Sequence, residues 1–174
     1  MKQQAITTLS LDRLMLSHGE GRRLQIPVRL GRVGLGSQEY RAEPETVPVE
    51  MQVSRTATGH AFRLSFGVRL EGPCMRCLRD AAVELDVDAR EVDQPGGGDE
   101  LSSPYVRGEE LDLQAWARDA LVLALPAQLL CRPDCAGLCP ECGKDLNVEP
   151  HEHEKPPDPR WDALRGLDLS EKGT

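Results

Sequence analysis

Hydrophobic side chains recur at every second residue in four separate stretches of this sequence. These stretches lie at 24–30, 49–53, 62–70 and 83–89. Such alternation is typical of antiparallel strands that bury one face and expose the other. Pro27 falls on the polar side of the first stretch, and because proline cannot donate to a strand ladder, we expect this strand at an edge of the sheet. The last two stretches, within 60–71 and 81–91, predict a hairpin.

A helical spacing follows a loop rich in Gly, Ser and Pro at 94–104. Asp112 is the expected N-cap of this helix, and Pro126 is expected to end it. A further short helix is predicted at 159–167, docking through Trp161 and Leu164. The apolar face of the first helix consists of Leu113, Trp116, Ala117, Ala120, Leu121 and Ala124.

These patterns predict an α+β fold: a twisted antiparallel sheet, one long helix packed on it, and a C-terminal extension stabilised by zinc. Only 3% of the 174 residues are aromatic, so the core must be built mainly from aliphatic side chains. From Cys131 onward the chain holds too few aliphatic residues for a core of its own. We therefore expect a sheet-plus-helix domain at 1–130 and a Cys/His-rich zinc-binding tail at 131–174.

Neither a membrane span nor a secretion signal is expected. The longest apolar stretch, 120–130, is interrupted by Pro126 and is too short to cross a bilayer. No apolar run follows the first four residues, as a secretion signal would require. The cytoplasm is therefore the expected location.

The net charge of −8 is unevenly distributed along the chain. Residues 1–80 hold 12 Lys and Arg against 8 Asp and Glu, whereas residues 81–174 hold 9 against 21. Dedicated nucleic-acid-binding proteins usually carry a basic excess, so the acidic half argues against that class. It favours a partner that is itself basic, such as a ribosomal protein. Plain solvation of both halves is the alternative interpretation.

Two predicted charged surfaces correspond to binding of a basic protein and to binding of nucleic acid. Glu84, Asp86 and Asp88 share the polar face of one predicted strand, and such an acidic stripe attracts Lys- and Arg-rich chains. The opposing candidate is a phosphate-binding patch in the neighbouring strand and turn. Its members are Arg63, Arg69, Arg76 and Arg79.

The spacing of the six cysteines indicates metal binding, since disulfides are disfavoured in the cytosol. Cys74 and Cys77 form a C-x-x-C in the turn of the predicted hairpin, and Cys139 and Cys142 form a second one, followed by Gly143. Glycine there suits a zinc knuckle, in which backbone N–H groups turn toward sulfur. Leu78 takes the equivalent place in the first motif, so we expect a less regular geometry there.

Six cysteines with His151 and His153 give eight candidate ligands, enough for two tetrahedral zinc sites. One partition has Cys74, Cys77, Cys131 and Cys135 in a first site, and Cys139, Cys142, His151 and His153 in a second. A rival partition has Cys131, Cys135, Cys139 and Cys142 around one ion, with Cys74 and Cys77 as a reduced pair. Six free thiols without metal are the third interpretation. His18 and His60 stand alone in the sequence and are interpreted as surface residues.

No enzymatic motif accompanies these residues. The zinc-deaminase order, H-x-E before P-C-x-x-C, is reversed here. The zinc-protease H-E-x-x-H is absent because His151 and His153 are two residues apart. A redox C-x-x-C belongs at a helix N-terminus in a βαβ unit, whereas Cys74 and Cys77 are expected in an antiparallel hairpin. We therefore expect no catalytic residue, no enzymatic activity and no small-molecule substrate.

Five motifs follow one another in a distinctive order between Phe62 and Leu167. They are Cys74-x-Arg76-Cys77-Leu78, Leu111-Asp112-Leu113, Leu123-Ala124-Leu125-Pro126, the Gly-Leu-Cys-Pro-Glu-Cys-Gly-Lys-Asp-Leu-Asn run at 137–147, and Asp158-Pro159-Arg160-Trp161-Asp162-Ala163-Leu164. This set resembles the YceD family, the bacterial and plastid large ribosomal RNA subunit accumulation proteins. The resemblance implies a role in 23S rRNA accumulation and large-subunit biogenesis. It also implies a link to ribosomal protein L32, a small basic protein whose gene commonly neighbours the family's gene.

One pair of positions departs from the family pattern. Members with the Gly-Leu-Cys-Pro-x-Cys-Gly motif usually carry Cys-x-Cys four and six residues after the Asn, where this chain has His151 and His153. Histidine in place of cysteine keeps zinc ligation open, so the resemblance implies that both histidines are ligands. Shorter members lack the module at 139–142 but keep a C-x-x-C like that of Cys74 and Cys77, which favours two separate sites.

We therefore expect a non-enzymatic ribosome-biogenesis factor that supports 23S rRNA accumulation and large-subunit assembly by binding, with one or two structural Zn²⁺ ions. The expected partner is the large-subunit precursor, reached through a basic ribosomal protein such as L32 or through rRNA contact. The alternative is a zinc-ribbon module that binds RNA or DNA directly. A zinc hydrolase is a third class, but the sequence lacks the pattern of an open catalytic site.

Overall fold

The computed structural model describes residues 6–154 and Arg160. The short helix expected at 159–167, with Trp161 and Leu164, falls on residues outside this set except for Arg160. The chain divides into two compact units, Met1–Cys135 and Ala136–Thr174. Cys131 and Cys135, expected in the tail, thus belong to the unit that holds the sheet.

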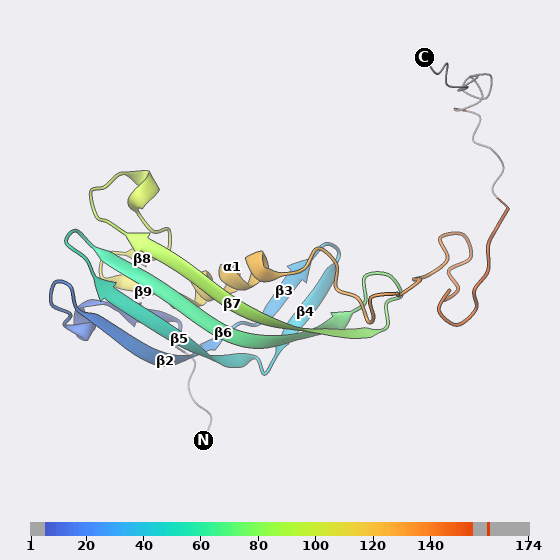
Figure 1. The fold of residues 1–174 in the computed structure, drawn as a ribbon, viewed down its shortest axis with the longest axis horizontal. Coiled ribbons are helices and arrows are strands. Elements are labelled where there is room, and N and C mark those ends of the chain that lie inside the picture. Colours follow the sequence, from blue (N-terminus) through green and yellow to red (C-terminus); the bar gives the residue numbers. More distant parts are fainter. Residues whose placement is uncertain (1–5, 155–159, 161–174) are drawn as a thin grey trace, which may run out of the picture. The chain divides into compact units, whose positions relative to one another are not determined.

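A six-stranded antiparallel sheet forms the body of the first unit (Figure 1). β5 pairs with one half of β6 and β4 with the other half, whereas β7 pairs with β6 along its whole length. β2 lies outside β5, so the strand that contains Pro27 is at an edge, as predicted. The strands are β2 (Gly21–Arg29), β3 (Arg32–Leu35), β4 (Gln38–Glu43), β5 (Thr46–Arg55), β6 (His60–Pro73) and β7 (Asp80–Asp93).

The alternating apolar residues all face the same side of this sheet. Val28, Val49, Met51, Leu64 and Leu70 are completely buried there. The intervening residues of β6 and β7 are half-buried or exposed. The predicted hairpin is confirmed by the pairing of β6 with β7, and at the turn β6 extends two residues and β7 one residue beyond the predicted bounds.

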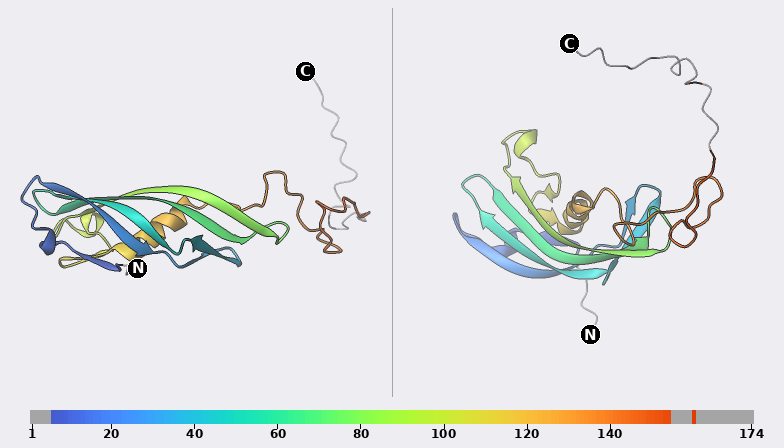
Figure 2. Two further views of the ribbon diagram at one scale, coloured as in Figure 1. Left: turned by 90° about the horizontal axis from the view of Figure 1, so that it is seen from below. Right: turned by 45° about the vertical axis from the view of Figure 1, so that its right-hand side comes forward.

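Helix α1 (Leu113–Ala124) lies in the concave face of the sheet (Figure 2). Its buried residues are Leu113, Trp116, Ala117, Ala120 and Leu121, which belong to the predicted stripe. The Asp112 side chain accepts a hydrogen bond from the backbone N–H of Ala115 at 2.9 Å, which confirms the N-cap. Leu125 then adopts an extended conformation before Pro126, so the helix ends where expected.

A second, three-stranded sheet lies beside the N-terminus of the helix. It consists of β1 (Thr8–Ser10), β9 (Glu110–Asp112) and β8 (Val106–Arg107) in that order. The alternating pattern predicts none of these short strands. Two 3-10 turns, η1 (Asp12–Leu14) and η2 (Asp99–Leu101), complete the described elements. None of the described helices has the length and apolar content that a membrane crossing requires.

The interpretation of His60 as a surface residue is wrong. Its side chain is only 5% exposed and stacks on Phe62 with ring centroids 5.8 Å apart. Arg55 Nη1 lies 2.9 Å from its Nε2. Burial, with the neighbouring guanidinium, lowers the pKa of His60 below its ordinary value of 6.5. His18, in contrast, is exposed as predicted.

Candidate metal centres

The turn between β6 and β7 folds as a knuckle around Cys74. The backbone N–H of Cys74 donates to the carbonyl of Arg79 at 2.7 Å, and the N–H of Leu78 donates to the carbonyl of Cys74 at 2.9 Å. Leu78 reaches this geometry with a φ of 61°, in the left-handed region. The expectation of a less regular first knuckle is therefore wrong, because leucine adopts the conformation for which glycine is usually used.

The segment after helix α1 brings two more cysteines to this knuckle. The N–H of Met75 donates to the carbonyl of Leu129 at 2.9 Å, which ties the segment to the turn. Cys74 Sγ lies 3.8 Å from Cys135 Sγ, and Cys77 Sγ lies 3.6 Å from Cys131 Sγ. All four sulfur atoms lie within 4.8 Å of one another, so they could hold one metal ion. Cys131 is half-buried and the other three cysteines are buried.

Cys74 and Cys131 of this first centre differ in acidity. Burial opposes ionisation of Cys74, but backbone N–H groups, among them that of Cys77, outweigh it and lower the pKa of Cys74 to about 6. Burial and the neighbouring sulfurs raise the pKa of Cys131 to about 12. Four thiolates this close repel one another, and a bound cation would remove the repulsion. Four cysteine sulfurs are therefore a suitable donor set for a metal centre in which every ligand is a cysteine.

The second unit contains a knuckle with the same hydrogen bonds. The N–H of Cys139 donates to the carbonyl of Lys144 at 2.8 Å, and the N–H of Gly143 donates to the carbonyl of Cys139 at 2.9 Å. Gly143 has a φ of 72°. Backbone donation by Cys142 lowers the pKa of Cys139 to about 6. The local backbone therefore stabilises a thiolate at the first cysteine of both knuckles.

Both histidines of the tail point to this second knuckle. His151 Nε2 lies 3.1 Å from Cys142 Sγ, while its Nδ1 lies 2.8 Å from the carbonyl of Glu149. A hydrogen bond from Nδ1 to a carbonyl leaves the Nε2 lone pair free for a metal, the arrangement usual for histidine ligands. His153 lies next to His151, with ring centroids 5.0 Å apart. Ligand atoms of Cys139, Cys142, His151 and His153 all lie within 4.8 Å of one another.

An Asx-type turn positions this tail segment. Asp145 Oδ1 accepts from the backbone N–H of Asn147 at 2.9 Å, and Asn147 Oδ1 accepts from the N–H of Ala136 at 2.8 Å. Leu138 and Asp145 form an isolated antiparallel bridge. Asp145 and Asn147 therefore have a structural role, which the motif alone does not indicate.

The structure thus assembles the eight candidate ligands into the first of the partitions considered. One group is Cys74, Cys77, Cys131 and Cys135, and the other is Cys139, Cys142, His151 and His153. Each group has four protein donors, as structural zinc sites do. Spacing alone did not distinguish this partition from the rival one, because the chain folds back over more than 50 residues to bring Cys131 to Cys77.

The arginines of the expected phosphate-binding patch are engaged by other groups. Arg63 forms a bidentate ion pair with Asp88 across β6 and β7. Arg69 Nε lies 3.1 Å from Glu71 Oε1, and its Nη1 lies 3.5 Å from Glu84 Oε1. Arg76 donates to the carbonyl of Cys135 at 3.0 Å. These contacts lower the positive potential available to phosphate.

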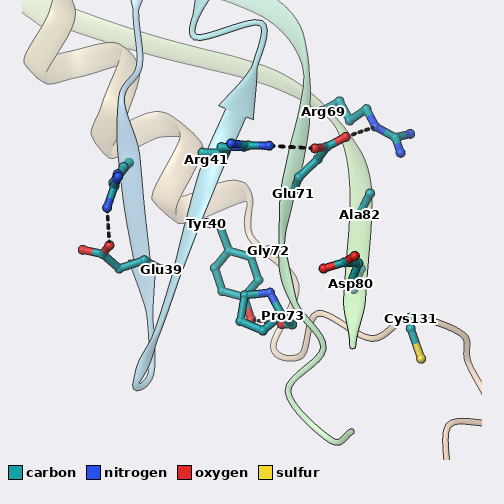
Figure 3. A pocket seen from close by; sticks show the side chains of 12 residues that line it. Glu39, Tyr40, Arg41, Arg69, Glu71, Gly72, Pro73, Asp80, Ala82 and Cys131 are labelled. Carbon is teal, nitrogen blue, oxygen red and sulfur yellow. Dashed lines mark hydrogen bonds and ion pairs between the residues drawn. The ribbon is translucent and has the colours of Figure 1, made fainter. Parts of the chain in front are cut away.

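An open hollow of about 850 Å³ lies beside the first centre (Figure 3). Cys131 lines one side, and charged and uncharged residues of β3, β4, β6 and β7 line the remainder. Arg41 and Arg69 both pair with Glu71 there, and Arg32 pairs with Glu39. Because each of the three arginines has a carboxylate partner, an anionic ligand would have to compete with that partner.

Comparison with known proteins places these features in a family. Residues 62–168 match the model of the family described as large ribosomal RNA subunit accumulation protein YceD. The chain is 40% identical over 125 residues to uncharacterised proteins of Mycobacterium tuberculosis and Mycobacterium bovis, covering 67% of this chain and 59% of each relative. It is 47% identical over 101 residues to an uncharacterised protein of Mycobacterium leprae, covering 54% and 46%. The chain thus spans less than two thirds of the length of these curated relatives. No solved structure matches it.

Proposed function

This chain belongs to the YceD family of large ribosomal RNA subunit accumulation proteins, and we propose that it supports 23S rRNA accumulation and large-subunit assembly by binding, without catalysing a reaction. The family match carries this proposal. It spans residues 62–168 and therefore includes most of β6, all of β7 and helix α1, and all eight candidate ligands. The matched segment is thus the part of the chain that builds both candidate metal centres.

The metal of both centres is Zn²⁺ in this proposal, and its role is structural. Cys₄ and Cys₂His₂ donor sets are those of structural zinc sites, whereas catalytic zinc keeps one position open for water or substrate. Each group here offers four protein donors. A closed site of this kind stabilises a fold and supplies no reactive water, which favours a binding protein over a hydrolase.

The direct partner is a basic ribosomal protein of the large subunit, such as L32, met in the cytoplasm. The ion pairs of Arg63 and Arg69 with carboxylates favour this choice over direct rRNA binding. The charge of residues 81–174, with 21 Asp and Glu against 9 Lys and Arg, also favours it. An acidic segment attracts a basic protein electrostatically, whereas it repels the phosphates of rRNA.

Depletion of the protein from its own cells tests the role in accumulation. The ratio of 23S to 16S rRNA should fall, and expression of the unaltered chain should restore it. An unchanged ratio in depleted cells would contradict the proposed function.

Affinity capture of the full chain tests the direct partner. Large-subunit precursors and basic ribosomal proteins should co-purify, and ribosomal protein should remain after nuclease treatment. Direct rRNA binding would instead weaken steeply with salt, because counterions are released from the phosphates. Capture of rRNA without ribosomal protein, abolished by Arg69→Ala with Arg76→Ala, would favour the nucleic-acid-binding alternative.

A further inference from the structure

Strand β7 has a long edge without a strand partner. Within residues 6–154, β7 pairs only with β6, and residues 81–92 take part in no backbone hydrogen bond outside that ladder. β4 and β5 each pair with part of β6, and Figure 1 shows β7 on the opposite side of β6 from β5. Ala82, Glu84, Asp86, Asp88 and Arg90 are all exposed. The outer-face side chains along this edge are therefore open to solvent.

The hydrogen bonds at both ends of the hairpin show which backbone groups face this edge. Cys74 donates to Arg79, so these two residues form a hydrogen-bonded pair. At the other end Thr56 donates to Gly59, so the next pair, Arg55 with His60, is not hydrogen-bonded. The backbone groups of His60 therefore face β7, which gives the same alternation as at the turn. Antiparallel pairs alternate between bonded and non-bonded. Every even-numbered residue from 82 to 90 is consequently in a non-bonded pair with β6, with its N–H and C=O directed outward.

The other edges of the sheet are less suited to accept a strand. β2 is interrupted by Pro27, which has no N–H and whose carbonyl already accepts from Ile6 at 2.9 Å. β3 has only four residues. β7 has 14 residues and contains neither proline nor glycine. It is thus the one long uninterrupted edge among the described strands.

The outward backbone groups and the acidic side chains belong to the same residues. Asp88 and Glu84 are partly neutralised by Arg63 and Arg69. Asp86 lies opposite Gly67, which has no side chain to cover it. A second β7 pairing with this edge would place carboxylates against carboxylates, which is unfavourable. A strand rich in Lys and Arg would place cations there instead.

The inner face of β7, which helix α1 contacts, still leaves apolar surface exposed. Val83, Leu85 and Ala89 point to the core but are only partly buried, whereas their neighbours on β6 are buried. Apolar side chains at alternate positions of an added strand would cover their exposed portions. An alternating sequence of cationic and apolar residues therefore suits both faces at once.

We infer that the free edge of β7 binds an extended Lys- and Arg-rich segment of a protein partner as an added antiparallel strand. The cationic residues lie over the outer face beside Asp86 and Asp88, and the apolar residues lie over Leu85 and Ala89. This inference rests on the proposed function, since it describes how the chain would hold a basic ribosomal protein.

Two backbone-methylated peptides test strand addition directly. The probe is a ten-residue peptide of alternating Lys and Val, and its binding to the zinc-loaded full chain is followed by fluorescence anisotropy. In an antiparallel strand the lysines oppose the outward groups of β7. N-methylation of the lysines should weaken binding roughly tenfold or more, because several hydrogen bonds are lost. N-methylation of the valines should leave it nearly unchanged. Equal binding of both peptides, or loss only with methylated valines, would overturn the inference.

A pair of protein variants tests the contribution of charge. Asp86→Ser with Asp88→Ser should weaken binding of the unmethylated peptide roughly tenfold at low salt and reduce its salt dependence. The matched control, Glu39→Ser with Glu45→Ser, removes the same charge from residues outside β7 and should bind like the unaltered chain. Equal weakening by both variants would show that net charge, and not the edge, attracts the peptide.

Failure of the inference and failure of the proposed function give different results. If the methylated peptides bind equally but 23S rRNA falls on depletion, only the strand-addition inference is wrong. If the peptides behave as expected but depletion leaves 23S rRNA unchanged, the edge binds basic strands and the proposed function is wrong.

Discussion

Leu78 and Gly143 occupy the same position in two knuckles and share one backbone conformation. Their φ angles are 61° and 72°, and each N–H donates to the carbonyl of the first cysteine of its knuckle at 2.9 Å. The left-handed conformation disfavours any residue with a Cβ. Leu78 is 55% exposed, so packing of its side chain offsets little of that cost.

Leu78→Gly should therefore stabilise the protein. Relief of the left-handed strain, about 1–2 kcal/mol, exceeds the entropy that glycine loses on folding, about 0.5–1 kcal/mol. The free energy of unfolding of the zinc-loaded protein should rise by about 0.5–1 kcal/mol in chemical denaturation. The reverse exchange is the control: Gly143→Leu meets no atom within 4 Å of its Cβ, so backbone strain alone should weaken zinc binding at the second centre. A less stable Leu78→Gly protein would mean that the leucine side chain makes important contacts.

Metal content should follow the two ligand groups independently. The chain purified without chelator should contain close to two zinc ions by elemental analysis. Cys139→Ser with Cys142→Ser should remove one ion and leave the sheet folded, because those ligands belong to the second unit. Cys74→Ser with Cys77→Ser should remove the other ion and lower the thermal midpoint, since it disconnects the hairpin turn from the segment after α1. Loss of both ions from the first variant would contradict separate centres.

Zinc ligation by the histidines should determine whether the tail is ordered. Only Gly137 and Cys139 are buried among the described residues of the second unit, so it has almost no hydrophobic core. His151→Ala with His153→Ala should expose the residues after Cys135 to limited proteolysis, while the sheet and helix stay protected. Glu152→Ala with Glu154→Ala, at exposed neighbouring positions, is the matched control. Equal protection of the histidine variant would show that the histidines are not ligands.

His60 should make stability depend on pH. Burial and Arg55 hold the pKa of His60 below 6.5 in the folded chain. Between that pKa and 6.5, the unfolded chain therefore binds a proton that the folded chain does not. The free energy of unfolding should therefore decrease as pH falls below about 6.5 and level off below the folded pKa. His60→Gln cannot titrate and should lose less stability between pH 7.5 and pH 6, measured by denaturation with excess zinc. The same pH response in both proteins would assign the effect to other groups.

The elements that sequence patterns predicted are those with long, uninterrupted periods. β6 with β7 and helix α1 each present their apolar face over twelve residues or more. β3 and β4 were missed because four and six residues leave only two inward side chains each, Val33 with Leu35 and Tyr40 with Ala42. β1 pairs with β9 about 100 residues away, and no local signal marks a three-residue strand of that kind.

The site residues divide in a similar way. Cysteine spacing identified all six thiols, but their grouping depended on the long-range fold that brings Cys131 to Cys77. Leu78 adopts a left-handed backbone conformation that leucine disfavours, because the surrounding turn requires it. Sequence alone predicts glycine for such a conformation. A signal for His60 was present: it lies two residues before Phe62, so the same alternation places it on the buried face.

The placement of the first knuckle at the tip of the hairpin has a consequence for strand register. A slip of one residue between β6 and β7 would exchange the faces of β7 and turn Val83, Leu85 and Val87 toward water. Cys74 directly follows the last of the fourteen pairs, Pro73 with Asp80, and Cys77 lies in the same short turn. An ion held by both cysteines would fix the length of that turn and thereby every pair beyond it. The metal would then fix the register of the hairpin, selecting one strand alignment among those that the alternating sequence allows.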